Sequence, residues 1–309
     1  MKRGTRQSLL LALAGLGLYA GIRMMTGTNR YDLRGRVVVI TGGSRGLGLA
    51  LARELAKRDA RLAICSRSLT QLESARQELA AAGAEVLALA CDVTDRSEVQ
   101  RLIDTVINHY GKIDVLINNA GIIQVGPMEV MSEKEFQEAM NIHFWAPLYT
   151  ILETLPHFRA RHEGRVINIS SIGGKVAVPH LLPYCASKFA LVGLSEGLAA
   201  ELKKENIIVS TIAPGLMRTG SPRNITVKGD HQKEYAWFKT AASMPILASD
   251  VNIVAERIID GLESNRTRPS VSLLERLASI SSEIAPEGID LLMAQMNRIL
   301  PGRGINGFE

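Results

Sequence analysis

Short apolar runs alternate with amphipathic stretches along most of the chain. The amphipathic stretches carry apolar residues every three or four positions, which predicts helices with one buried face. The apolar runs show no polar alternation, which is typical of parallel strands buried on both faces. The predicted strands are Val37–Thr41, Arg61–Ser66, Glu85–Ala90, Ile113–Ile117, Arg165–Ser170, Ile207–Ala213 and Pro269–Ser272. This alternation predicts an α/β fold with a doubly wound, mostly parallel, seven-stranded sheet and helices on both faces.

The predicted helices connect these strands within one large domain, residues 34–272. They cover about 69–82, 96–110, 132–161 and 250–264, and two more end near Arg58 and Glu205. The segment from Pro214 to about Pro245 is predicted to be irregular. Residues 1–33 and 273–309 are predicted to be an N-terminal anchor with its linker and a C-terminal amphipathic helical extension.

The N-terminal segment contains an unbroken run of apolar residues, glycines and one tyrosine over Leu9–Ile22. A helix over Leu9–Gly27 would reach roughly 28 Å, barely the hydrocarbon thickness of a bilayer. We therefore expect residues 8–25 to hold the protein at a membrane, as an uncleaved anchor or an interfacial helix. A cleaved secretory signal is the main alternative, although no convincing small-x-small cleavage site follows the run. The larger basic cluster after the run favours a main domain that faces the cytoplasm.

The positive charge of the chain belongs to the same segment. The formal net charge is +5, yet residues 1–36 hold seven basic residues and one acid, so the remainder carries −1. This distribution argues against a nucleic-acid-binding face. The three cysteines, Cys65, Cys91 and Cys185, show no metal-ligand spacing and are expected to be reduced thiols. No metal site is predicted.

A glycine-rich turn follows the first predicted strand and leads directly into a helix. Strand, glycine-rich turn and helix form a dinucleotide-binding arrangement, because glycines admit the pyrophosphate and the helix N-terminus attracts its charge. This predicts a Rossmann-type domain that binds a dinucleotide. The turn residues expected to contact that cofactor are Gly42, Ser44, Arg45, Gly46, Leu47 and Gly48.

The end of the second predicted strand indicates which dinucleotide is bound. An acid at this place would hold the adenosine ribose diol, but the chain has Ser66 followed by Arg67. Arg67 and Arg45 are suited to grip a 2′-phosphate, which favours NADP(H). Ordinary solvated surface arginines are the alternative interpretation.

Tyr184 and Lys188 lie four residues apart and therefore share one face of a helix. A nearby ammonium favours the phenolate and would lower the pKa of the tyrosine. Ser171 follows a predicted strand, where ligands meet an open α/β sheet. The three side chains are candidates for proton transfer, and an ordinary exposed Tyr–Lys pair is the alternative.

These motifs, in this order and spacing over residues 35–270, closely resemble the short-chain dehydrogenase/reductase family. The resemblance implies that Tyr184 is the general acid/base, that Lys188 holds the nicotinamide ribose, and that Ser171 binds the substrate oxygen. It also implies further cofactor contacts at Asp92 and Val93 (adenine), Asn119, Ala120 and Gly121 (adenine ribose), and Pro214, Gly215 and Thr219 (nicotinamide).

One position departs from the family pattern. The family usually has a catalytic Asn thirteen residues before a Pro near the end of the long helix, where counting back from Pro156 gives His143. Asn141 would face elsewhere, since two residues are roughly 200° around a helix. We assign His143 to this place and expect its ring to hold a water for proton relay; a packed structural histidine is the alternative.

Apolar residues near the predicted site suggest the substrate. Residues around the expected mouth of the site are Val178, Leu181, Leu182, Trp237 and Phe238. They favour a small hydrophobic carbonyl compound or alcohol, with the irregular segment as a mobile cover. The alternative function is a nucleotide-binding regulatory or scaffold protein without turnover. Residues 273–309 are expected to cap the domain, with a partner subunit in a homo-oligomer or a membrane as alternatives.

Overall fold

The fold is given by a computed structural model that describes residues 30–219, 225–244 and 248–301. The predicted apolar helix and membrane anchor over residues 8–25 lie outside the described residues. Within the described part of the chain, no helix is long and apolar enough to cross a bilayer.

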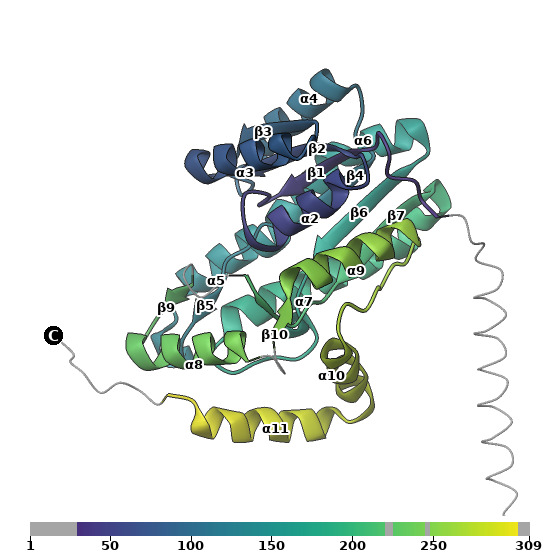
Figure 1. Ribbon diagram of the computed structural model, residues 1–309. Helices are drawn as coiled ribbons and strands as arrows, with labels where there is room; N and C mark the ends of the chain where they lie inside the picture. The colour runs from purple at the N-terminus through teal and green to yellow at the C-terminus, as the bar shows by residue number, and fades with distance from the viewer. Residues whose placement is uncertain (1–29, 220–224, 245–247, 302–309) are drawn as a thin grey trace, which may run out of the picture. The chain divides into compact units, whose positions relative to one another are not determined.

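A single sheet of six parallel strands lies at the centre of the domain (Figure 1). Its strands are β1 (Val37–Thr41), β2 (Arg61–Ser66), β3 (Val86–Ala90), β4 (Val115–Asn118), β6 (Gly164–Ile169) and β7 (Ile207–Ile212). The spatial order is β3-β2-β1-β4-β6-β7, with every neighbouring pair parallel. The direction of winding reverses between β1 and β4, and such a switch point is where open α/β sheets bind ligands.

Helices cover both faces of the sheet, as the apolar strands require. One face carries α2 (Gly46–Ala56), α3 (Leu69–Ala81) and α9 (Val251–Glu263); the other carries α4 (Arg96–Tyr110), α6 (Ala146–Arg161) and α7 (Leu182–Leu202). Local signals set their ends. Asp95 caps α4 by accepting from the backbone N–H of Ser97 at 2.8 Å, and Gly111 ends it with φ of 77°.

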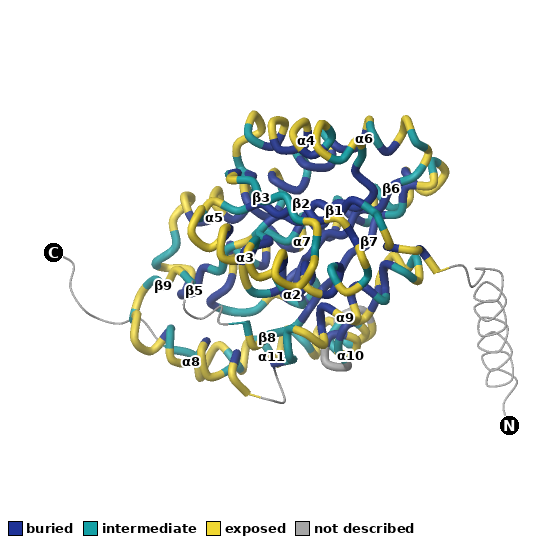
Figure 2. The backbone as a smooth tube through the Cα atoms, turned by 45° about the horizontal axis from the view of Figure 1, so that its top comes forward, coloured by how far each residue is buried: buried dark blue, intermediate teal, exposed yellow. Residues whose placement is uncertain are grey.

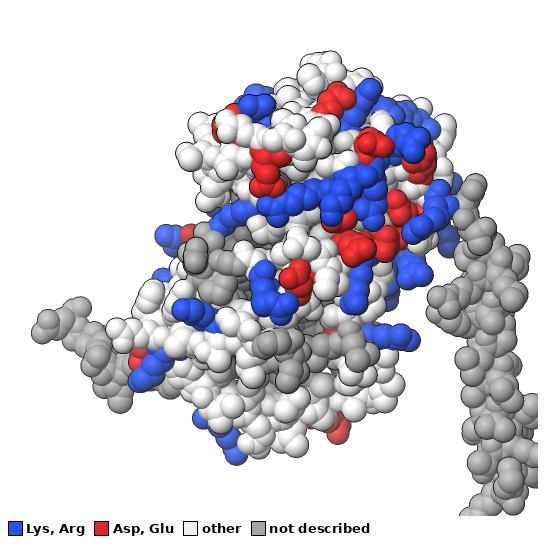
Figure 3. All heavy atoms as spheres, in the orientation of Figure 1, with Lys and Arg blue, Asp and Glu red and all other residues white. Residues whose placement is uncertain are grey.

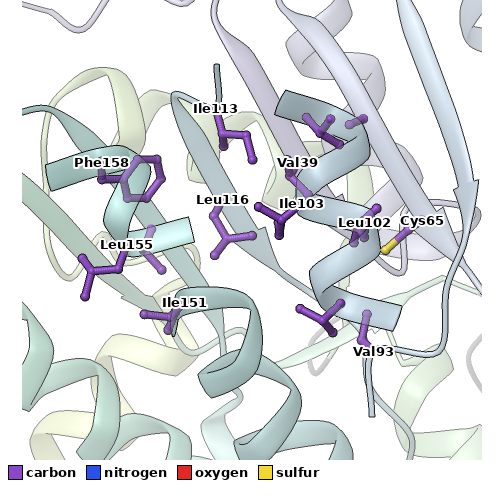
Figure 4. Close-up of a cluster of buried hydrophobic side chains, with 14 of the residues drawn as sticks. Val39, Cys65, Val93, Leu102, Ile103, Ile113, Leu116, Ile151, Leu155 and Phe158 are labelled. Carbon is purple, nitrogen blue, oxygen red and sulfur yellow. The ribbon is translucent and has the colours of Figure 1, made fainter. Parts of the chain in front are cut away.

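The largest apolar cluster lies between the sheet and the layer of α4, α6 and α7 (Figure 4). Val39 on β1 and Leu116 on β4 are fully buried and face Ile103 on α4 and Phe158 on α6. Burying one such side chain contributes about 1.5–3 kcal/mol, so this cluster supplies much of the stability. Figure 2 shows the strands as the most buried part of the chain.

A buried carboxylate joins the strands at the end of the sheet opposite the switch-point crevice. Asp114 accepts hydrogen bonds from the Val37 N–H at 2.8 Å, from Arg161 at 2.5 Å and from Arg36 at 3.2 Å, and Lys112 lies 3.0 Å away. Burial opposes ionisation of Asp114, but these donors hold its pKa below the usual value. The cluster therefore fixes β1 against β4 at their first residues.

Two predicted elements were wrong. The sheet has six strands, because Pro269–Ser272 is not a strand. The chain contacts β7 just before this segment, where the Thr267 carbonyl oxygen accepts from the Thr211 N–H at 2.8 Å and the Arg266 carbonyl oxygen accepts from the Ser210 hydroxyl at 2.8 Å. Pro269 has no N–H to continue such a ladder. The supposedly irregular segment contains a helix, α8 (His231–Ser243), which Asp230 caps by accepting from the Lys233 N–H.

The long helix predicted over 132–161 is interrupted. It consists of α5 (Glu133–Met140), a π-helical turn η2 (Asn141–Trp145) and α6. Pro147 has no N–H to donate to the carbonyl of His143, so a regular α-helix cannot continue there. Such π-turns are frequent at functional sites.

The C-terminal extension forms α10 (Leu273–Ile284) and α11 (Pro286–Ile299). Leu277, Ile280, Ile284 and Leu292 are exposed, whereas Ile289, Met293, Met296 and Leu300 are half-buried. In the view of Figure 3, the part of the surface over α8, α10 and α11 carries few charged side chains. Basic and acidic side chains lie close together over the rest of that face.

Candidate active site

A cavity of about 800 Å³ opens at the carboxyl ends of the strands, across the switch point between β1 and β4. Nearly every residue predicted from the sequence lines it. These residues are Gly42, Ser44, Arg45, Gly46, Leu47, Ser66, Arg67, Asp92, Val93, Asn119, Ala120, Gly121, His143, Ser171, Tyr184, Lys188, Pro214, Gly215 and Thr219. Gly48 is the exception and does not line the cavity.

The glycine-rich turn is shaped by two close backbone approaches. Gly42 has φ of 65°, and a Cβ there would lie 2.9 Å from the Cα of Ala120. A Cβ on Gly48 would lie 2.2 Å from the carbonyl oxygen of Gly42 and 2.6 Å from Nδ2 of Asn119. The predicted cofactor contact of Gly48 is therefore replaced by a packing role: it lets α2 begin directly against the turn.

Asn119 holds this turn in place from the end of β4. Its Nδ2 donates to the carbonyl oxygens of Thr41 at 3.0 Å and Gly42 at 3.1 Å. The hydroxyl of Thr41 in return accepts from the backbone N–H groups of Asn119 and Ala120. The polypeptide thus engages both hydrogens of the Asn119 amide, and this side chain shapes the cradle rather than projecting free donors into it.

The two arginines predicted to read a 2′-phosphate stand at the rim of the cavity. Both side chains are exposed, and Nη1 of Arg67 lies 3.9 Å from the carboxylate of Asp92. Asp92 also accepts from the Thr94 hydroxyl at 2.7 Å. No carboxylate follows β2 where a ribose diol would need one, because Ser66 occupies that place.

Ser171 and Tyr184 meet at the centre of the cavity. Ser171 follows β6, and its Oγ accepts from the Gly173 N–H at 3.1 Å. Tyr184 lies in the first turn of α7 and lines the same cavity as Ser171. Burial raises the pKa of Tyr184 to about 12, and the nearby Ser171 hydroxyl opposes that rise. The expected lowering of the Tyr184 pKa by Lys188 is therefore not found in the polypeptide alone.

Lys188 lies one helical turn beyond Tyr184 and is only 4% exposed. Its Nζ donates to the carbonyl oxygen of Ile169 at 2.8 Å and stands 5.7 Å from the centre of the Tyr184 ring. Burial lowers the pKa of Lys188 to about 7. This group can gain or lose a proton near neutral pH, which is unusual for a lysine.

His143 points into the site from the π-turn η2, whereas Asn141 is exposed. Its Nε2 accepts from the Ile122 N–H at 3.2 Å, so in the neutral ring Nδ1 carries the hydrogen. Nδ1 then donates to Oγ of Ser187 at 2.8 Å, and Ser187 donates to the Tyr184 carbonyl oxygen. The ring also meets the Tyr184 ring edge to face, with centroids 5.3 Å apart.

These contacts correct the expected role of His143. Burial, together with the charge of Lys188, holds the pKa of His143 well below its usual value, so the ring is neutral. Both ring nitrogens bond to the protein, which leaves none to hold a water. His143 is a positioning residue that links η2 to the first turn of α7, beneath Tyr184. Gly121 permits this, since a Cβ there would lie 3.0 Å from Nε2.

One end of the cavity is apolar. Its walls include Val178, Leu181, Trp237, Phe238 and Ala242, the last three from α8. Of the residues predicted from the sequence for this mouth, Leu182 is the one that does not line the cavity; it is exposed. The sequence placed Trp237 and Phe238 at the mouth of the site but in an irregular segment, and did not indicate that they lie on a helix.

Two further residues that line the cavity were not predicted from the sequence. The buried thiols of Cys65 and Cys91 line the end of the cavity near β2 and β3. Cys65 is the penultimate residue of β2, and Cys91 follows β3, which pairs with β2. Their position at the ends of consecutive predicted strands is the one signal that pointed to this place.

Comparisons with known proteins agree with this geometry. The family model described as short chain dehydrogenase matches residues 36–228. 17-Beta-hydroxysteroid dehydrogenase 13 of Rattus norvegicus is 28% identical over 297 residues, covering 94% of this chain and 93% of that protein.

Solved structures share the architecture. A short chain dehydrogenase/reductase of Burkholderia phymatum in complex with NAD has a TM-score of 0.77 at 23% identity, covering 85% of this chain and 96% of its own. A variant of actinorhodin polyketide ketoreductase with NADPH has a TM-score of 0.68 at 28% identity, covering 77% of this chain and 95% of its own. Since the matched family model spans well over half of the chain, the protein belongs to the short-chain dehydrogenase/reductase family of oxidoreductases.

Proposed function

We propose that this protein is an NADP(H)-dependent oxidoreductase that interconverts a hydrophobic carbonyl compound and its alcohol. The observation that carries the proposal is the convergence of Ser171, Tyr184 and Lys188 in one cavity with the glycine-rich cradle. The cradle fits a dinucleotide, because Gly42 and Gly46 line the cavity without side chains and α2 begins at Gly46, where its N-terminus attracts a pyrophosphate. When bound, the nicotinamide supplies or accepts a hydride.

The side chains of the chain then handle the proton and the developing charge. The Ser171 hydroxyl and the Tyr184 phenol hydrogen-bond to the substrate oxygen, and in the reducing direction Tyr184 gives its proton to that oxygen. A phenol with a pKa near 12 favours the protonated form, which suits it to donate. The Lys188 ammonium stabilises the phenolate that remains, since an opposite charge nearby favours the charged form.

A panel of apolar ketones and aldehydes, followed by the absorbance of the reduced nicotinamide, tests this reaction. We expect turnover that Tyr184→Phe abolishes while leaving NADPH affinity within about threefold. Tight NADPH binding without turnover of any carbonyl compound would instead support the alternative, a nucleotide-binding regulatory or scaffold protein.

The preference for NADP(H) is supported by Arg67 and Arg45 at the rim and by the absence of an acid at Ser66. The similar polyketide ketoreductase carries NADPH, whereas the Burkholderia protein, similar in fold, carries NAD. We expect Arg67→Ala to weaken NADPH binding by about 1.5–3 kcal/mol, the worth of a hydrogen bond to a charged group. NADH binding should hardly change.

Arg61→Ala is the matched control for this experiment. Arg61 is an exposed arginine at the opposite end of β2, where it pairs with Glu85 at 3.0 Å. The control should leave both affinities unchanged. Equal losses for NADPH and NADH in Arg67→Ala would show that Arg67 does not read the phosphate.

We also propose that residues 8–25 hold the protein at a membrane, with the main domain on the cytoplasmic side. The apolar run and its basic flanks support this proposal. Replacing Leu13 and Leu16 together by Arg should release the full-length chain into the soluble fraction of lysed cells, because each charge in a bilayer is costly. A mature N-terminus beyond residue 20 in the parent protein would contradict the proposal.

A further inference from the structure

A buried polar cluster lies behind the apolar wall of the cavity and takes no part in the reaction proposed above. Glu234 on α8 is fully buried, and both of its oxygens accept from Nδ1 of His180, at 2.8 and 3.0 Å. The indole Nε1–H of Trp237 donates to the same carboxylate at 2.7 Å. A buried carboxylate is stable only when it is paired in this way, so these contacts fix the three side chains together.

His180 joins α8 to two other parts of the fold. It lies in the segment before α7, and its carbonyl oxygen accepts from the Gly126 N–H at 2.9 Å, just after β5 (Gln124–Val125). β5 in turn pairs with β9 (Thr226–Val227), which precedes α8. Figure 1 shows β5, β9 and α8 side by side. His180 has φ of 65°, a left-handed conformation that is uncommon outside glycine and often marks a functional position.

The consequence for the cavity follows from the Trp237 hydrogen bond. Because Glu234 takes the indole N–H, Trp237 presents only its ring surface beside Val178, Leu181 and Phe238. This end of the cavity therefore offers no donor or acceptor from those side chains. The polar contacts for a substrate lie at Ser171 and Tyr184 instead.

We propose that the His180–Glu234 pair is a positioning device that fixes Trp237 as a specificity-determining wall. The favoured substrates are then carbonyl compounds whose remaining part is a bulky, wholly apolar group, and a polar group on that part is rejected. This inference rests on the proposed function and names the substrate class of the same site. Apolar walls reject an added hydroxyl by about tenfold to a hundredfold in kcat/KM.

The test compares two probe ketones, 4-phenylcyclohexanone and 4-(4-hydroxyphenyl)cyclohexanone, in the full-length protein. The parent should prefer the first by at least tenfold in kcat/KM. Glu234→Gln has a single side-chain acceptor for two donors, so we expect KM for the phenyl ketone to rise about five- to tenfold. The preference should fall below threefold, while kcat stays within about twofold, because Ser171 and Tyr184 are untouched.

A spectroscopic readout separates this inference from the reaction itself. The chain has two tryptophans, so in a Trp145→Phe background the emission reports on Trp237 alone. Glu234→Gln should shift that emission to longer wavelength, and quenching titrations with both ketones give their Kd values. If the parent turns over no carbonyl compound, the proposed function fails, yet the Kd ratio of the two ketones still decides the role of Trp237.

Two further variants protect the test against misfolding. His180→Asn breaks the pair while tolerating the left-handed backbone, and Trp237→Phe removes the N–H and part of the wall; both should lower the preference as Glu234→Gln does. Glu256→Gln, an exposed glutamate on α9, is the matched control and should change nothing. An unchanged preference in all three variants, or a parent that binds both ketones equally, would overturn the inference.

Discussion

Replacing Lys188 by Met should make the protein inactive and, near neutral pH, more stable. Lys188 is 4% exposed and its pKa is about 7, against a usual value near 10.4. Between those two pH values the unfolded chain binds a proton that the folded chain does not, so the parent loses stability as the pH falls from about 10.4 to 7. At lower pH the loss is complete.

The magnitude follows from the same values. Burying Lys188 lowers the free energy of unfolding of the parent by about 4 kcal/mol at pH 7 and about 2 kcal/mol at pH 9, since each pH unit between the two pKa values is worth about 1.4 kcal/mol. Methionine has a similar shape and no charge, but it leaves the Ile169 carbonyl without the 2.8 Å bond, which costs about 1–2 kcal/mol. We expect a net gain of about 2 kcal/mol at pH 7 and almost none at pH 9.

Urea unfolding of the full-length protein at both pH values measures this gain as a shift in midpoint at constant m-value. Lys134→Met is the matched control, because the Lys134 side chain is 76% exposed and its replacement should change stability by less than about 0.5 kcal/mol at either pH. A Lys188→Met protein that is less stable than the parent at pH 7, or equally stabilised at both pH values, would refute the reasoning.

Three further predictions concern single positions. In the parent, the buried His143 ring stays neutral while the unfolded chain binds a proton, so the free energy of unfolding falls by up to about 1.4 kcal/mol per pH unit below about pH 6.5. His143→Asn should remove this pH dependence, measured from urea midpoints, without changing the pH profile of turnover above pH 6. Asp114→Asn should lower the free energy of unfolding by about 3 kcal/mol at pH 7, because it removes the negative charge of a fully buried side chain that faces three cations. The Asp114 pKa is lowered in the folded protein, so the difference in stability between parent and variant should shrink as the pH falls below about 4. Gly48→Ala should weaken NADPH binding more than tenfold in a titration, because the new Cβ would lie 2.2 Å from the Gly42 carbonyl oxygen and would distort the glycine-rich turn. An NADPH affinity within twofold of the parent would contradict this prediction.

The sequence by itself determined the features that depend on local pattern. Apolar runs placed the six strands to within a residue or two, because parallel strands buried on both faces show no polar alternation. The glycines after β1 marked the cradle. The four-residue spacing of Tyr184 and Lys188 placed both on one face of α7. The motifs resembling the dehydrogenase/reductase family then gave the cavity lining almost completely.

Only the tertiary structure decided which of these groups are free to act. The burial that lowers the pKa of Lys188 comes from segments far away in sequence, and the bonds that occupy both nitrogens of His143 come from Ile122 and Ser187. In the same way His180 and Glu234, 54 residues apart, meet only because α8 folds against the segment before α7. Local periodicity reports which face of an element is buried, but partners across the fold, and hence charge states and free hydrogen-bonding groups, are set by long-range packing.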